Sequence, residues 1–69
     1  MENKYPKLRG RIVEKYKKIS IFAREVGYHP QTIYAKLNGQ IPMTTRDIAK
    51  WMQPLDIPSE EIVDYFFAP

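Results

Sequence analysis

The sequence contains no cysteine, and this absence removes two sources of stability that small proteins often use. Without thiols the chain can form neither disulfide bonds nor a thiolate metal site. His29 is the single histidine, and because it has no second histidine or cysteine to share a metal ion, we expect no metal site and interpret it as a helix cap. Stability must therefore come from packed helices or from association between copies.

Long apolar segments are also missing. The longest uninterrupted apolar run, Tyr65 to Ala68, is far shorter than the ~18 residues that a membrane span needs. No apolar segment follows Lys4 to form a signal peptide. We therefore expect a soluble, cytoplasmic protein with no membrane partner.

Residues arranged for catalysis are equally scarce. Neither Ser20 nor Ser59 has a convincing base nearby in the pattern. The adjacent Glu60 and Glu61 would point in different directions on a helix, which suits a helix N-terminus better than acid–base work. We therefore expect no enzyme activity, no cofactor and no small-molecule substrate.

The composition that is present is typical of a folded domain, with 43% hydrophobic and 28% charged residues. A chain of 69 residues and 8.2 kDa has room for one hydrophobic core only. We expect a single domain over residues 1–69, in which residues 1–6 form an N-terminal arm that ends at Pro6.

Positive charge is concentrated in the first half of the chain. Residues 1–36 hold nine cations against three carboxylates, a net charge of +6. Residues 37–69 hold two cations against five carboxylates, a net charge of −3. This distribution indicates that the first half meets an anion such as nucleic acid. The alternative is a solvated helix face with a chance imbalance, and charge by itself does not decide between the two.

Apolar residues recur every three or four positions, which predicts helices. The expected helices cover residues 7–18, 21–26, 30–38, a fourth from residue 44 to a stop or kink at Gln53-Pro54, and 59–67. No useful segment alternates in period two. The predicted class is all-α, with five short helices.

Local signals mark where these helices begin and end. Ser20 can cap the second helix, and Gly27 can supply the positive φ that follows its last turn. His29 is expected to cap the third helix, with Pro30 as its first residue. Thr44 precedes Asp47 by three residues, a short-armed form of the capping box.

Residues 22–39 form a helix-turn-helix pattern. Ala23 provides a small residue where two helices cross, Gly27 provides the turn, and Ile33 provides a buried anchor on the second helix of the pair. The sequence resembles the lambda-repressor-like helix-turn-helix family of phage repressors and Cro proteins over residues 7–67, on these three positions and on the closing pair Asn38-Gly39. One departure is that the next inward residue, Leu37, lies four positions after Ile33, where better-known members have it three positions on.

The resemblance implies a sequence-specific DNA-binding transcriptional regulator, a repressor or Cro-like protein that reads the major groove with its third helix. Carried over position by position, base contacts fall on the outer face of that helix, at Gln31, Thr32, Tyr34 and Ala35. A glutamine amide can pair with adenine through two hydrogen bonds, and an alanine methyl can contact thymine. Phosphate contacts would bracket the groove at Lys17, Lys18, Ser20, Arg24, Tyr28, Lys36, Asn38 and Gln40.

Double-stranded operator DNA is the expected partner, and a homodimer is expected because one short helix reads few base pairs. A monomer that pairs only on DNA is equally compatible with the sequence. Either Phe66 or Phe67 is expected to be exposed and to dock a second copy. The rival interpretation is a protein-interaction module, such as an antirepressor or antitoxin-like adaptor, that uses the same fold with its aromatic C-terminus as the interface.

Overall fold

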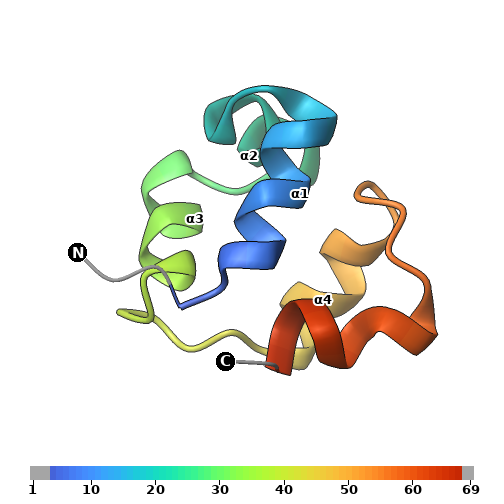
Figure 1. Ribbon diagram of the computed structural model, residues 1–69. Coiled ribbons are helices and arrows are strands. Elements are labelled where there is room, and N and C mark those ends of the chain that lie inside the picture. Colours follow the sequence, from blue (N-terminus) through green and yellow to red (C-terminus); the bar gives the residue numbers. More distant parts are fainter. Residues whose placement is uncertain (1–3, 68–69) are drawn as a thin grey trace.

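The computed structural model describes residues 4–67. Within this range the regular secondary structure is helical, and there is no strand. The helices are α1 (Pro6–Tyr16), α2 (Ile19–Val26), α3 (Pro30–Leu37) and α4 (Thr45–Met52), followed by the 3₁₀ turn η1 (Ser59–Glu61) and the π-helix η2 (Val63–Phe67) (Figure 1). The predicted all-α class with five helical regions is confirmed, with η1 and η2 together forming the fifth. None of the helices within residues 4–67 has the length and apolar character needed to cross a membrane.

The core lies where α1 meets the other helices. In Figure 1, α1 occupies the centre, α3 lies on one side of it and α4 on the other, while α2 packs against both α1 and α3. Trp51 of α4 is fully buried and makes edge-on ring contacts with Phe22 and Tyr28, at centroid distances of 5.4 and 5.5 Å. The other fully buried large side chains are Phe22, Leu8, Ile12, Ile33, Leu37 and Leu55.

The junction between α1 and α2 differs from the prediction. Helix α1 ends at Tyr16 instead of residue 18, because Lys17 adopts a left-handed backbone with φ of 73°. Helix α2 begins at Ile19, two residues earlier than expected, because the side chain of Ile19 is buried in the core. The prediction that Ser20 caps α2 is wrong, since Lys18 occupies the cap position without a side-chain cap bond.

The turn into α3 follows the sequence signals closely. Gly27 takes the left-handed conformation with φ of 78°, and the Tyr28 N–H donates to the Ala23 carbonyl at 2.8 Å. His29 Nδ1 accepts a hydrogen bond from the Gln31 N–H at 3.1 Å, and Pro30 is the first helical residue. The predicted glycine turn, histidine cap and proline start are therefore confirmed.

The C-terminal end of α3 and the start of α4 also agree with the prediction. Gly39 has φ of 82°, and the Gln40 N–H reaches back to the Ala35 carbonyl at 2.8 Å, which closes α3. Thr44 and Asp47 form the predicted capping box, with reciprocal hydrogen bonds of 2.9 and 3.1 Å. Helix α3 is thus bounded at both ends by residues with a defined backbone geometry.

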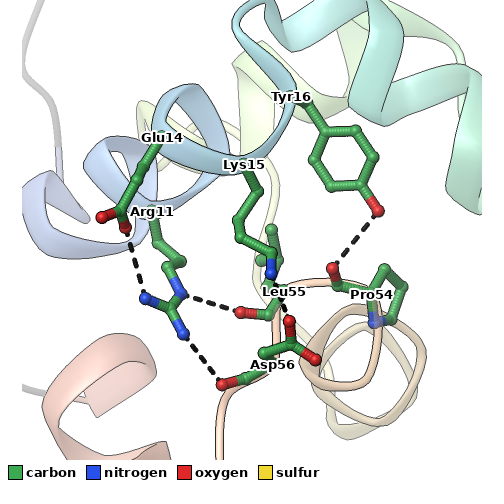
Figure 2. Close-up of polar contacts among 7 residues, drawn as sticks. All are labelled: Arg11, Glu14, Lys15, Tyr16, Pro54, Leu55 and Asp56. Atoms are coloured by element: carbon green, nitrogen blue, oxygen red, sulfur yellow. Dashed lines mark hydrogen bonds and ion pairs between the residues drawn. The ribbon is translucent and has the colours of Figure 1, made fainter.

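Helix α4 stops at Met52, directly before the Gln53-Pro54 pair, as predicted. The loop that follows is held by side chains of α1 (Figure 2). Arg11 donates from Nε to the Leu55 carbonyl at 2.8 Å and from its terminal nitrogen to the Asp56 carbonyl at 2.9 Å. Lys15 pairs with the Asp56 carboxylate, and the Tyr16 hydroxyl donates to the Pro54 carbonyl at 3.2 Å. These contacts provide donors for backbone carbonyls of the loop after α4.

The C-terminal helix separates its two adjacent phenylalanines. Phe66 is 3% exposed and belongs to the core, whereas Phe67 is 64% exposed. The expectation that one of this pair stays on the surface is confirmed. Val63, four residues earlier, is equally exposed.

Candidate nucleic-acid interface

The outer face of α3 gathers the four side chains that the sequence predicts as base contacts. Helix α3 turns Ile33, Lys36 and Leu37 inward, where they are buried. The opposite face borders an open hollow of about 460 Å³. Its lining consists of Gln31, Thr32, Tyr34, Ala35, Asn38, Gln40 and Ile41, which includes all four predicted base contacts and two of the predicted phosphate contacts.

Lys36 is the largest departure from the predicted site. Its side chain is buried, and its ammonium lies 2.7 Å from the Asp47 carboxylate and donates to the Pro42 carbonyl at 3.0 Å. The structure therefore contradicts a phosphate contact by Lys36, because its charge is neutralised inside the protein. The position three residues after Ile33 does face inward, as in better-known members of the resembled family, but a paired cation occupies it.

Tyr28 is also engaged internally. Its hydroxyl donates to the Asp47 carboxylate, and Lys50 Nζ lies over its ring at 5.5 Å from the centroid. Burial is the largest cause and this hydrogen bond the second, and they raise the pKa of Tyr28 to about 12. The predicted phosphate contact by the Tyr28 hydroxyl is replaced by an internal contact, because the Asp47 carboxylate is a strong acceptor.

Asp47 is the residue whose importance the sequence pattern understated. We expected it only as part of a cap, yet it is 3% exposed and accepts from Lys36, Tyr28 and Thr44. Burial alone would raise the pKa of Asp47, but these hydrogen bonds outweigh burial and lower the pKa to about 2. A signal for this role was present in the sequence: Asp47 is an acidic residue near the start of α4, and Lys36 is a lysine at an inward position of α3, so the two could form a buried ion pair.

Other cations of the basic half also have internal partners. Lys7 lies 3.9 Å from the Asp64 carboxylate and 4.7 Å from the Tyr65 ring centroid. Arg9 lies over the Tyr34 ring at 5.8 Å from its centroid. Arg11 and Lys15 hold the loop after α4. Many of the cations in the first half of the chain therefore contact other groups of the protein itself.

The remaining predicted phosphate contacts lie between the end of α1 and the last turn of α2. Lys17, Lys18, Ser20 and Arg24 are all exposed. Their side chains form no hydrogen bond or ion pair with any other residue between 4 and 67. The cations among them leave their charge to solvent or to a ligand.

A second open hollow, of about 420 Å³, lies beside the C-terminal helix. It shares Ile41 with the α3 hollow, and Ile41 is 40% exposed. Phe67 contributes an exposed ring to the same hollow. The full lining is Lys4, Tyr5, Gly39, Ile41, Pro42, Phe66 and Phe67, so the two hollows adjoin at Ile41.

Comparison with known proteins relates the whole chain to a phage regulator. The solution structure of the modulator of repression (MOR) of the temperate bacteriophage TP901-1 from Lactococcus lactis is similar, with a TM-score of 0.81 and 31% sequence identity. The match covers 97% of this chain and 90% of that one. No curated protein matches the chain. The model of one family matches residues 1–69, and the chain therefore belongs to the family described as Protein of unknown function (DUF739).

Proposed function

We propose that this protein is a phage-type transcriptional regulator that binds DNA with the outer face of α3 in the major groove. The observation that carries the proposal is that Gln31, Thr32, Tyr34 and Ala35 line one open face of a helix whose opposite face is buried. A recognition helix needs this division, because its buried side fixes its orientation while its free side meets base edges.

The distribution of free charge supports the same mode of binding. Lys17 and Lys18 keep unpaired charges before the N-terminal end of α2, the helix that packs against α3, and Arg24 keeps one in its last turn. In helix-turn-helix proteins the first helix of the motif crosses the DNA backbone while the second enters the groove. We assign phosphate contacts to these three cations and to Ser20, and also to Asn38 and Gln40, which line the α3 hollow.

The similar phage protein supports a regulatory role. It is described as a modulator of repression, and the resemblance extends over nearly the whole of this chain. We propose that this protein likewise acts on repression in a phage or prophage, as a repressor or Cro-like switch. Two copies on a two-fold operator would raise specificity, and the exposed Phe67 is the proposed contact between them.

The test is a fluorescence anisotropy titration of the protein against random and selected duplexes at several salt concentrations. We expect log affinity to fall by about 0.9 per phosphate contact for each unit of log salt. Gln31→Ala should flatten the preference for the selected duplex, because it removes a bidentate base contact. Gln53→Ala, an exposed glutamine in the loop after α4, is the matched control and should leave the preference unchanged. Absence of DNA binding at low salt would falsify the proposal.

An apolar surface favours a second candidate function, that of an adaptor which binds a repressor protein. Phe67 and Val63 are each 64% exposed, and Ile41 is 40% exposed beside the second hollow. Exposed apolar side chains that gather at a hollow are typical of a protein-binding site. Phe67→Ser should abolish binding to a purified phage repressor in analytical ultracentrifugation and leave any DNA binding by a monomer intact. Unchanged repressor binding by this variant would exclude the aromatic surface as the interface.

A further inference from the structure

One buried polar cluster connects α3 with both of the segments that flank it. Lys36 comes from α3, Tyr28 from the turn before α3, and Asp47 from the first turn of α4. Lys36 is 7% exposed and Asp47 is 3% exposed, so both charges lie inside the protein. Lys36 lies on the inward side of α3, whereas Gln31 and Ala35 line the open hollow on its outer side.

A single carboxylate is the centre of this cluster. Asp47 Oδ2 lies 2.7 Å from Lys36 Nζ and accepts from the Thr44 N–H at 2.9 Å, while Oδ1 accepts from the Tyr28 hydroxyl. Lys36 Nζ also donates to the Pro42 carbonyl at 3.0 Å. The carboxylate therefore joins α3, the turn before it and the first turn of α4, and Lys36 joins α3 to the loop after it.

These contacts differ in kind from the apolar contacts of α3. Ile33 and Leu37 are fully buried and anchor α3 to the core, but apolar contact is non-directional and tolerates a small rotation of the helix about its axis. Hydrogen bonds require defined distances and angles. Replacing a buried ion pair with apolar residues is often neutral for stability, so its role is better sought in orientation.

We propose that Lys36, Asp47 and Tyr28 form a positioning unit that sets the rotation of α3 about its axis and so the direction in which Gln31 and Ala35 point. The three residues act through α3 and are not themselves contacts to DNA. The consequence for sequence preference rests on the proposed function. The orientation of α3 does not, and it is measurable on the free protein.

The decisive variant is the double substitution Lys36→Met with Asp47→Leu, which removes both charges and leaves no buried charge unpaired. Residual dipolar couplings of backbone N–H and Cα–Hα groups, followed along the helix, report the rotation of α3 about its axis as well as its direction relative to α1. We expect the double variant to fold, and the couplings of α3 to change while those of α1 remain. Its preference for a selected duplex over a random one should fall about tenfold, equivalent to the removal of one bidentate base contact, with an unchanged salt slope.

A second variant keeps the test valid if the double variant fails to fold. Tyr28→Phe retains the ring against Trp51 and removes only the hydroxyl that donates to Asp47. We expect a smaller change of the α3 couplings in the same sense as in the double variant. Lys15→Met is the matched control, because it breaks an ion pair between α1 and the loop after α4 and should leave the α3 couplings unchanged.

Two results would overturn the inference. One is that the α3 couplings of the double variant equal those of the wild type. If the double variant does not fold, the same comparison is made with Tyr28→Phe. The other is a salt slope lowered by about 0.9 with unchanged sequence preference, since this would make Lys36 a phosphate contact. If the wild type binds no DNA at low salt, the proposed function fails, while the couplings still decide whether the cluster orients α3.

Discussion

Lysine and arginine residues have different roles on α1 and in the segment from the end of α1 to the last turn of α2. On α1, Arg11 and Lys15 bind the carbonyls and the carboxylate of the loop after α4 (Figure 2). At and after the end of α1, Lys17, Lys18 and Arg24 have no side-chain partner among residues 4–67. The two groups are adjacent in the sequence, yet only the second has charge available for a ligand.

This difference teaches that a count of charges overstates what a protein offers to nucleic acid. At least five of the nine cations in residues 1–36 contact a carboxylate, a carbonyl or an aromatic ring of the protein itself, among them Lys7, Arg9, Arg11, Lys15 and Lys36. A cation that is bound internally stabilises the fold and contributes little to a distant phosphate. We therefore expect removal of a free cation to leave the stability of the fold nearly unchanged, and removal of a bound cation to destabilise the fold according to how far its contact is buried.

The largest expected effect on stability comes from breaking the buried pair. Lys36→Met leaves the Asp47 carboxylate inside the protein without its cation, and we expect a loss of about 3–5 kcal/mol in the free energy of unfolding. Urea denaturation followed by circular dichroism measures this loss. A change below about 1 kcal/mol would show that Asp47 is solvated in solution, and it would place Lys36 with the free cations.

Removal of the Arg11 guanidinium should have the next largest effect. Arg11→Met retains most of the aliphatic stem but removes two charge-assisted hydrogen bonds to the carbonyls of Leu55 and Asp56, at 2.8 and 2.9 Å. We expect a loss of about 2 kcal/mol in the free energy of unfolding, again by urea denaturation. Lys7→Met is the control, because its exposed contact with Asp64 at 3.9 Å should contribute less than about 1 kcal/mol.

Acid should weaken the buried pair over a defined range of pH. The pKa of Asp47 is about 2 in the folded protein, below its ordinary value of 3.8. Because the folded-state pKa is the lower one, the stabilisation is complete above about pH 4 and is lost as the pH falls through 2, by about 2 kcal/mol in total. Urea midpoints measured between pH 5 and 2 follow this loss. The double variant Lys36→Met with Asp47→Leu should show a smaller slope, and an equal slope would assign the acid sensitivity to other carboxylates.

The free cations should contribute least to stability. Replacing Lys17, Lys18 and Arg24 together by alanine should change the free energy of unfolding by less than about 0.5 kcal/mol per site. The same variant should lower the slope of log affinity for DNA against log salt by about 0.9 for each phosphate that no longer has a cation beside it. A matched replacement of Lys50, which lies over the Tyr28 ring, should leave the salt slope unchanged. An unchanged slope in the triple variant would remove these cations from the proposed interface.

Local signals in the sequence predicted the elements of the fold well. Gly27, His29 and Pro30 act through their own backbone geometry or through neighbours one or two residues away, and the structure places them as expected. The boundary between α1 and α2 was harder to predict, because burial of Ile19 depends on distant helices and draws it into α2. Ser20 has good capping chemistry, but tertiary packing places the cap at Lys18.

In the candidate site, too, some features follow from local signals and others depend on tertiary packing. Gln31, Thr32, Tyr34 and Ala35 share one face because helical spacing alone determines which residues lie together, and the sequence sufficed to select them. Whether Lys36 and Tyr28 point outward depends on Asp47, which is more than ten residues away along the chain, so no local pattern could show it.

The sequence by itself determined the all-α class, the turn and caps around α3 and the set of residues on its outer face, because these follow from backbone preferences and helical periodicity. Only the tertiary structure decided which charges remain free, because an ion pair forms where folding brings two side chains that are distant in the sequence within about 4 Å of each other. Lys36 and Lys18 are both lysines of the basic half, and the fold alone buries the first beside Asp47 and leaves the second on the surface.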